Sequence, residues 1–271
     1  MRISDCHLGF IGFGHMAQVI CRAIEKSRLI PRSKISFIQR DSHKMKKNEQ
    51  DFGITSTSLS HLLDQSDLIL IGVRPNQAHL VLEKMGGIPE SKMIVSILAG
   101  VPLAYYQKYF GTKNPLLRVM PNIASAVGKG MSVFSYAPGS STEFKSLTNL
   151  LFSCMGEIIE VPERLMDIAC GVAGSGPGFV FRLIEAMASA GETGGLGRED
   201  ALKMAAQTFA GAAELILKGG QPATLLQQIS VPHGTTEAGL KVMSEHQMDA
   251  HFRSVVEAAA QRSQELSEEF R

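Results

Sequence analysis

Short apolar runs alternate with segments of helical spacing along the first 160 residues or so of the chain. Continuous apolar runs of this length, separated by amphipathic helices, are typical of parallel strands buried on both faces of a sheet. Helical spacing between them is clearest over His15–Arg28 and Ser42–Gln50. The repeated β–α units predict a doubly wound α/β sheet. The predicted strands are Leu8–Phe13, Ile35–Ile38, Asp67–Val73, Met93–Leu98 and Leu116–Met120.

The pattern changes near residue 160. Beyond Pro162 no segment has a convincing strand pattern, and stretches of helical spacing follow, separated by glycine-rich or proline-containing breaks. We therefore predict an α/β domain over residues 1–160 and an all-α domain over residues 161–271. The apolar faces of these helices exceed what a single layer can bury, which predicts a homodimer or higher homo-oligomer. The predicted helices are Leu165–Ala190, Arg198–Lys218, Ala223–Ile229, Thr235–Glu245 and Asp249–Phe270.

Charge and hydropathy narrow the class of protein. The 271 residues include 27 Lys and Arg against 26 Asp and Glu, a formal net charge of +1. A balance this close to neutral argues against a basic face for nucleic acid or for an anionic membrane. The apolar runs are far too short to cross a bilayer, and the N-terminal segment lacks the pattern of a signal peptide. We predict a cytoplasmic protein that binds neither nucleic acid nor a membrane.

The cysteines and histidines offer no framework for a metal. Cys6, Cys21, Cys154 and Cys170 form no CxxC pair, and too few cysteines are present for a disulfide scaffold. His246 and His251 stand too far apart in sequence to share one face of a helix. We predict reduced, buried thiols and no bound metal.

The motif that carries most chemical information follows the first predicted strand. Gly12-Phe13-Gly14-His15-Met16-Ala17 has the form G-x-G-x-x-A and opens the first predicted helix. The first glycine permits a tight turn, the second lets the backbone approach a pyrophosphate, and the alanine lets helix and sheet pack closely. We predict that these six residues bind a dinucleotide cofactor. A glycine turn with no ligand is the alternative.

The end of the second predicted strand bears on which dinucleotide is bound. A site that prefers NAD usually carries Asp or Glu there, whereas this chain has Gln39-Arg40 with Ser42 and Lys44 close behind. An arginine with nearby donors suits a 2′-phosphate, so we predict NADP(H) in preference to NAD(H), with NAD(H) also possible. Asp41 lies just past the expected position and complicates the prediction. A solvated loop charge is the alternative for Arg40.

Three further loops follow predicted strands at the same carboxyl edge of the sheet. Ligands of doubly wound sheets bind at this edge, so we predict that these loops line the cofactor. Each of them could instead be a simple turn. The residues concerned are Val73, Arg74, Pro75, Ala99, Gly100 and Asn122.

Two segments of the helical half are unusual. Val231-Pro232-His233-Gly234-Thr235-Thr236 precedes a predicted helix, and either simple capping or a backbone nest for a carboxylate explains it equally well. Gly174-Ser175-Gly176-Pro177-Gly178 falls inside a predicted helix that these residues disfavour. Close packing of helices, or of a ligand, is needed to explain the second segment.

These motifs together resemble the pyrroline-5-carboxylate reductase family, in order and spacing over nearly the whole chain. The resemblance rests on FIGFGHMA (Phe10–Ala17), GVRP (Gly72–Pro75), LAG (Leu98–Gly100), RVMPN (Arg118–Asn122), GSGPGF (Gly174–Phe179) and PHGTT (Pro232–Thr236). It implies an N-terminal Rossmann-type domain and a helical C-terminal domain that interlocks with a partner subunit. It also implies hydride transfer from NAD(P)H to the C=N carbon of 1-pyrroline-5-carboxylate, which yields L-proline in the last step of proline biosynthesis.

The resemblance further implies roles for individual residues. Backbone amides of the glycine-rich turn, here Gly234 and Thr235, would hold the substrate carboxylate. The hydroxyl of Thr236 would reach the imine nitrogen as the catalytic group, and Glu163 would lie near the substrate by its position. An imine accepts hydride without a strong protein acid, so orientation and one hydrogen bond suffice.

The chain departs from the usual family pattern at several positions. His233 stands in a turn that is usually SPGGTT or SPGGAT, Arg74 replaces a lysine, and Glu237 replaces an apolar residue. A histidine is tolerable where φ is positive but costs more than glycine. These departures leave open another cyclic imine as substrate.

Two other functions remain as alternatives. A β-hydroxyacid dehydrogenase would carry a catalytic lysine on the helix after Gly176, where this chain has none. An NADP-binding regulatory paralogue with little activity would keep the dinucleotide motif and lose the substrate turn. Retention of Thr235 and Thr236 argues against this regulator, whereas His233 keeps it open.

Overall fold

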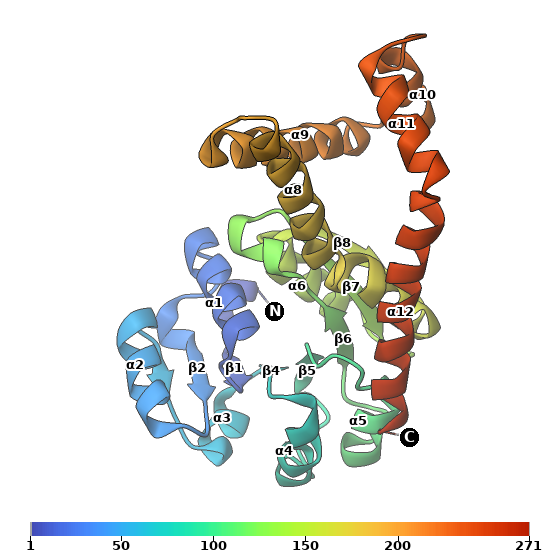
Figure 1. Cartoon of the computed structure of the whole chain (residues 1–271). Coiled ribbons are helices and arrows are strands. Elements are labelled where there is room, and N and C mark those ends of the chain that lie inside the picture. The colour runs from blue at the N-terminus through green and yellow to red at the C-terminus, as the bar shows by residue number, and fades with distance from the viewer. Residues whose placement is uncertain (1, 271) are drawn as a thin grey trace. The chain divides into compact units, whose positions relative to one another are not determined.

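The computed structural model describes residues 2–270, which form two compact units. Unit 1 consists of residues 2–175 together with 258–270, and unit 2 consists of residues 176–257. Figure 1 shows the chain coloured from its N-terminus to its C-terminus. The two units are described one after the other.

Unit 1 is built on an eight-stranded sheet with the order β3-β2-β1-β4-β5-β6-β7-β8. The first six strands in this order run parallel, β7 is antiparallel to β6, and β8 is parallel to β7. Because β1 lies between β2 and β4, the order reverses there, which is where doubly wound sheets bind their ligands. The strands are β1 (Leu8–Ile11), β2 (Ile35–Ile38), β3 (Thr55–Ser56), β4 (Leu68–Ile71), β5 (Met93–Ser96), β6 (Leu116–Met120), β7 (Gly130–Tyr136) and β8 (Gly156–Glu160).

Helices cover both faces of this sheet, because alternate residues of its central strands point to opposite sides. In β4, Leu68 and Leu70 join one apolar core, and Ile69 and Ile71 join the other. The first core is covered by α1 (His15–Ser27), α2 (Ser42–Phe52) and α6 (Thr142–Ser153). The second is covered by α3 (Leu59–Gln65), α4 (Ala78–Lys84), α5 (Leu103–Phe110) and the buried side chain of Phe270.

Short helical turns complete unit 1. Five of them are 3₁₀ turns: η1 (Ile3–Asp5), η2 (Arg32–Lys34), η3 (Pro75–Gln77), η4 (Ile123–Val127) and η5 (Glu163–Leu165). The segment after η5 is helical, as predicted, but it is not one continuous α-helix. A π-helical turn, η6 (Cys170–Gly174), follows α7 (Met166–Ala169) and precedes α8 (Gly176–Thr193). Within it the Ala173 carbonyl accepts a hydrogen bond from Asn122 Nδ2 (3.0 Å), and Gly174 packs against Met120.

The C-terminal end of α12 (Met248–Glu268) packs on unit 1. Ser263 Oγ donates to Asp167 Oδ1 (2.7 Å), and the Phe270 ring lies edge-on to Tyr105 with centroids 5.0 Å apart. A Cβ at Gly100 would lie 2.8 Å from the Cβ of Leu266. Figure 1 shows this end of α12 beside α5. Unit 1 is therefore completed by residues far along the chain.

Unit 2 contains only helices among its described residues. Its best-buried contact joins α8 (Gly176–Thr193) and α9 (Arg198–Leu217) through Ala188, Ala201 and Ala205. α10 (Pro222–Ile229), α11 (Thr235–Glu245) and the first part of α12 follow. Many large apolar side chains of these helices are exposed in the single chain, among them Phe181, Met204, Leu215, Leu217, Ile229 and Val242. No helix of the described residues has both the length and the apolar character that crossing a bilayer requires.

The predicted fold class is confirmed, with omissions. Strands β3, β7 and β8 were not predicted. β3 has only two residues, and β8, at the edge of the sheet, has only two adjacent apolar residues between two glutamates. β8 ends at Glu160, beyond which the described residues contain no strand. The compact units divide the chain after residue 175 and include residues 258–270 in unit 1, and the division into domains over 1–160 and 161–271 stays a prediction.

Candidate active site

The turn after β1 packs directly against the turn after β4. Gly12 has φ +88°, and a Cβ there would lie 2.8 Å from the carbonyl carbon and oxygen of Gly72. Gly12 N–H donates to Ile38 O (2.9 Å), and Gly72 N–H donates to Ile11 O (2.8 Å). A Cβ at Gly72 would in turn lie 3.6 Å from that of Ala17. Small residues at these three positions therefore fix α1 close to the sheet.

The N-terminus of α1 presents backbone donors to open space. Gly14 is the N-cap, and a Cβ there would meet no heavy atom within 4 Å. The first backbone N–H of this helix with an acceptor is that of Gln18, which donates to Gly14 O (3.0 Å). Three N–H groups have no protein acceptor among the described residues, and such a helix N-terminus binds anions. They belong to His15, Met16 and Ala17.

Phe13 contributes only its backbone to this turn. Its ring is buried against Phe37 and Phe52, with centroids 4.6 Å and 5.0 Å apart. His15 is exposed and Met16 is half-buried. In the predicted motif, the side chains of Phe13 and Ala17 thus belong to the core, whereas the backbone N–H groups at the start of α1 remain free to bind a ligand.

At the end of β2, Gln39 belongs to a chain of side-chain amides. Asn48, buried on α2, donates to Gln39 Oε1 (2.8 Å) and accepts from Gln18 Nε2 (3.4 Å), which also donates to Phe13 O (3.1 Å). This network joins α1, α2 and the end of β2. Gln39 is therefore held in place beside the turn that carries Phe13.

Asp41 serves as the N-cap of α2. Its Oδ1 accepts from the backbone N–H of Lys44 (3.1 Å) and of His43 (3.0 Å), and these hydrogen bonds hold the pKa of the carboxyl below its usual value. The carboxylate that complicated the sequence argument is therefore engaged by its own helix.

Arg40 is exposed beside this cap and forms no ion pair with any described carboxylate. Its guanidinium is held instead by Gln77, at the end of η3. Gln77 Oε1 accepts from Arg40 Nη1 (3.0 Å) and Nη2 (3.3 Å) when the amide oxygen faces the guanidinium. Ser42 and Lys44 are exposed nearby in the first turn of α2. An anion at this point would meet an uncompensated positive charge.

The other predicted cofactor residues follow β4, β5 and β6. Val73 is half-buried, exposed Arg74 precedes η3, and Pro75 is its first residue. Gly100 has φ +75°, and a Cβ there would collide with Leu266. Its backbone conformation and this packing therefore require glycine, whether or not a ligand binds. Ala99, its neighbour, is half-buried.

Asn122 follows β6 and is almost fully buried. Its Nδ2 donates to Ala173 O, and its Oδ1 accepts from the N–H of Ala124 (3.2 Å) and of Met131 (3.3 Å). Its side chain is thus committed to the protein. Binding of the cofactor by Asn122 stays a prediction, and with the side chain engaged in this way the backbone would make the contact.

Glu163 lies in unit 1 at the centre of a partly buried charge cluster. Its Oε1 accepts from the N–H of Leu103 (2.6 Å), which opens α5, and lies 3.4 Å from Arg118 Nη1. Asp167 Oδ1 lies 3.8 Å from Arg118 Nη2. The guanidinium is buried, so these two carboxylates compensate its charge. One oxygen of Glu163 therefore has a structural role.

The second predicted turn, before α11, lies in unit 2. His233 has φ +61°, in the left-handed region, and its N–H donates to Glu237 Oε2 (2.7 Å). Gly234 is the N-cap, and a Cβ there would lie 2.9 Å from Val231 O. A residue with a side chain occupies position 233, while glycine is required at 234.

This turn also presents backbone donors. Gly234 N–H donates to Val231 O (3.0 Å), so of the predicted pair only Thr235 N–H has no acceptor among the described residues. The N–H groups of Thr236 and Glu237 are equally without one. Thr235 and Glu237 are exposed and Thr236 is half-buried. The arrangement is a helix N-terminus that can accept a carboxylate.

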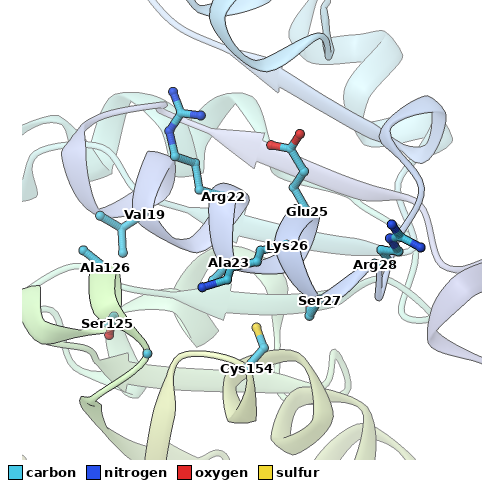
Figure 2. A pocket seen from close by; sticks show the side chains of 11 residues that line it. Val19, Arg22, Ala23, Glu25, Lys26, Ser27, Arg28, Ser125, Ala126 and Cys154 are labelled. Atoms are coloured by element: carbon cyan, nitrogen blue, oxygen red, sulfur yellow. The ribbon is translucent and has the colours of Figure 1, made fainter.

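A cavity of about 870 Å³ beside the second half of α1 holds none of the predicted site residues. Figure 2 shows the side chains of Arg22 and Glu25 extending from α1 in a direction away from Cys154. The Arg22 guanidinium stacks on Phe52, 4.2 Å from the ring centroid, and burial raises the pKa of the Cys154 thiol. The cavity therefore offers neither a free cation from Arg22 nor an activated nucleophile.

Similarity to known proteins covers nearly the whole chain. The family model described as pyrroline-5-carboxylate reductase dimerisation matches residues 163–266, and the one described as NADP oxidoreductase coenzyme F420-dependent matches residues 7–100. A pyrroline-5-carboxylate reductase of Arabidopsis thaliana is 35% identical over 264 residues, which cover 96% of this chain and 95% of that protein. The chain belongs to the pyrroline-5-carboxylate reductase family. One from Methanosarcina acetivorans is also 35% identical, over 96% of this chain and 97% of its own.

Solved structures of the pyrroline-5-carboxylate reductase family have the same fold. That of Plasmodium falciparum pyrroline carboxylate reductase, with NADP bound, matches with a TM-score of 0.89 at 27% identity, covering 98% of this chain and 99% of that one. The one from Coxiella burnetii matches with a TM-score of 0.87 at 27% identity, covering 97% and 98%. The resemblance inferred from the motifs is confirmed.

The residues of unit 1 fit a nicotinamide dinucleotide. The free N–H groups of α1 and the open space at Gly14 suit a pyrophosphate, and Arg40 has no carboxylate partner among the described residues. Reasoning from the motif missed two contributors, Asn48 and Gln77. Neither belongs to a recognisable motif. Asn48 holds Gln39 in place and Gln77 holds Arg40.

Proposed function

We propose that this protein reduces 1-pyrroline-5-carboxylate to L-proline with hydride from a nicotinamide cofactor. The observation that carries the proposal is similarity to proteins named pyrroline-5-carboxylate reductase over 96% of the chain. The two helix N-termini with free backbone donors support it, because both the cofactor and the proposed substrate are anions.

The cofactor contacts are assigned to the turn after β1 and the loops beside it. The backbone N–H groups of His15, Met16 and Ala17 would hold the pyrophosphate, and the open backbone at Gly14 would let it approach. Gln39 and Arg40 would face the adenosine ribose. The loops that contain Val73, Arg74, Pro75, Ala99, Gly100 and Asn122 would complete the rim.

The substrate contacts are assigned to the turn before α11. Backbone N–H of Thr235, with that of Thr236, would hold the carboxylate, and Gly234, the N-cap of this helix, would lie beside it. The Thr236 hydroxyl is proposed to hydrogen-bond the imine nitrogen and so to orient the C=N bond. Glu163, whose Oε1 is engaged by Leu103, is proposed to lie near the substrate through its other oxygen.

The reaction needs little from protein acids. When bound, the reduced nicotinamide supplies a hydride to the carbon of the C=N bond, while the nitrogen carries a proton taken from water. An imine nitrogen protonates readily, so the protein's contribution is orientation and one hydrogen bond. This suits a turn that offers the hydroxyls of Thr235 and Thr236 at the start of its helix and carries no carboxylic acid of its own.

The finer features of the proposal follow from the same residues. Arg40, with Ser42 and Lys44 nearby, favours NADP(H) over NAD(H). The exposed apolar side chains of α8 to α11, together with the matched dimerisation model, support a homodimer. Cell fractionation would test the predicted cytoplasmic location.

The hydroxyl of Thr236 provides the direct test. NADPH oxidation is followed with 1-pyrroline-5-carboxylate for the wild type, for Thr236→Val, which keeps the shape and removes the hydroxyl, and for Thr236→Ser, which keeps the hydroxyl. We expect kcat to fall on the order of 100-fold in the valine variant, the cost of removing one preorganised donor. The serine variant should retain most of the activity.

Two results would contradict this proposal. NADPH binding without turnover in the wild type would favour the regulatory paralogue. Equal activity of the valine and serine variants would remove Thr236 from the reaction. Comparison with other cyclic imine carboxylates in the same assay would define the substrate.

A further inference from the structure

Gln77 connects two loops that flank the dinucleotide motif. It follows β4, ends η3 and precedes α4, and its half-buried side chain reaches Arg40 at the end of β2. The sheet order β2-β1-β4 places the strand that carries the motif between these two loops. The Gln77–Arg40 contact therefore bridges the carboxyl edge of the sheet over the end of β1.

The position of Gln77 is well defined by its backbone. Its N–H donates to Arg74 O (2.9 Å), which closes the 3₁₀ turn that begins with Pro75. Proline fixes its own φ and stiffens such a turn. The amide oxygen of Gln77 is thus presented to the exposed guanidinium from a rigid base, whereas Arg40 itself follows the end of a strand.

The chemical nature of this partner matters. An amide oxygen accepts hydrogen bonds from a guanidinium without carrying a charge, so it orients the group and leaves its positive charge uncompensated. A carboxylate in the same place would form an ion pair and compete with any anion. Arg40 has no carboxylate partner among the described residues, and Asp41 is engaged by the backbone of α2.

We propose that Gln77 is a specificity-determining residue that positions Arg40 for the 2′-phosphate of NADP(H). The inference rests on the proposed preference for NADP(H). Gln77 lowers the conformational freedom that the long arginine side chain would otherwise lose on binding. The remaining donors of the guanidinium stay available, and their planar arrangement suits a phosphate.

Binding of cofactor fragments by the full-length protein tests this role without turnover. Calorimetry compares adenosine 2′,5′-bisphosphate with adenosine 5′-monophosphate, which differ only in the 2′-phosphate. We expect Gln77→Ala to weaken the bisphosphate about fivefold, the net contribution of one ordinary hydrogen bond, and the monophosphate hardly at all. Gln77→Glu should weaken the bisphosphate more, by about tenfold or above, because its carboxylate compensates Arg40.

Two further variants make the result interpretable. Arg40→Ala measures the whole effect of the guanidinium on the ratio of the two affinities. Gln65→Glu makes the same chemical change at an exposed position at the end of α3, before the amino end of β4, and should leave both affinities unchanged. In turnover, the Gln77 variants should raise KM for NADPH and leave kcat and KM for NADH near the wild-type values.

The outcomes separate this inference from the proposal on which it rests. If Arg40→Ala leaves the affinity ratio unchanged, the assignment of the 2′-phosphate to Arg40 is wrong. If Arg40→Ala lowers the ratio and both Gln77 variants keep it, the role of Gln77 is overturned and the NADP(H) preference stands. Equal weakening of both fragments by Gln77→Ala would show a loop-folding role instead, and would also overturn the inference.

Discussion

The turns before α1 and before α11 present similar groups to a ligand but are held in different ways. Each has a glycine N-cap, Gly14 or Gly234, with no side-chain cap, and each leaves three N–H groups without a protein acceptor in the described part of the chain. Each also contains a residue with positive φ, Gly12 in the first and His233 in the second. The surroundings of these two residues differ completely.

Position 12 is determined by packing, whereas position 233 is determined by a hydrogen bond. A Cβ at Gly12 would collide with the backbone of Gly72, so only glycine fits. His233 is exposed, its side chain has space, and the carboxylate of Glu237 holds its N–H. A left-handed backbone conformation can thus be stabilised in two ways. Packing can exclude every residue except glycine, or a neighbouring side chain can hydrogen-bond the backbone N–H.

The largest effect is expected where packing leaves no freedom. Gly12→Ala places a methyl group 2.8 Å from the backbone of Gly72 at a φ that alanine disfavours, so we expect a loss of about 2–5 kcal/mol in unfolding free energy. Urea unfolding of the two proteins measures it. A loss below about 0.5 kcal/mol, the range for ordinary surface changes, would mean that the turn after β1 can move away from Gly72 at little cost.

Gly14→Ala is the matched control for this variant. Its φ of −81° is ordinary for alanine and no heavy atom of the protein lies within 4 Å of the new methyl group, so stability should fall by no more than the roughly 1 kcal/mol that alanine costs at an N-cap. NADPH affinity should fall, because the methyl group occupies the space proposed for the pyrophosphate. Unchanged affinity would place the cofactor elsewhere.

A smaller effect is expected at the turn before α11. Glu237→Ala removes the acceptor of the His233 N–H, and we expect KM for 1-pyrroline-5-carboxylate to rise about fivefold, equivalent to roughly 1 kcal/mol for the hydrogen bond. Glu237→Gln keeps an acceptor and should be milder. NADPH affinity should not change in either variant.

The glycine variant at position 233 sharpens this prediction. In a His233→Gly background the left-handed conformation needs no support, so Glu237→Ala should then cost less than it does beside histidine. A double-mutant cycle on KM measures the difference. Equal costs in both backgrounds would show that Glu237 acts on the substrate directly and not through the backbone of residue 233.

The smallest effect is expected for thiol labelling beside the first turn. Burial raises the pKa of the Cys6 and Cys21 thiols to about 12, so both remain protonated at pH 8 and become reactive thiolates only if the pH approaches that value. We expect no labelling of either residue by a thiol reagent at pH 8 until the protein unfolds. Labelling in the native state would mean that β1 and α1 open more readily than their packing indicates.

The sequence predicted these two turns unequally well. The spacing of small residues predicted a tight turn at Gly12 and close packing of the following helix on the sheet. The apolar runs predicted the buried strands that became β1 and β4. The hydrogen bond between Glu237 and His233 was not predicted, because it depends on a rotamer and on the sign of one φ angle. The sequence did identify both positions as departures from the family pattern.

Contacts between distant segments were the harder part of the site to predict. Gln77 and Arg40 lie on separate loops, and no pattern in either loop indicates the other. Gly100 was predicted to face the cofactor, while in the structure its missing side chain also makes room for Leu266, far along the chain. Strand β7 was missed because Ser132 and Ser135 interrupt its apolar residues, and β8, at the edge of the sheet, because it has only two apolar residues between its glutamates.

The contribution of residues 258–270 to unit 1 has a consequence for biosynthesis. All eight strands leave the ribosome before the whole of residues 176–257 has been translated, and only afterwards does the segment that covers Gly100 and Tyr105 emerge. During this interval, the part of the nascent sheet domain that residues 258–270 later cover stays exposed to solvent. Folding of the nucleotide-binding half is therefore completed late in translation, although its sequence is synthesised first.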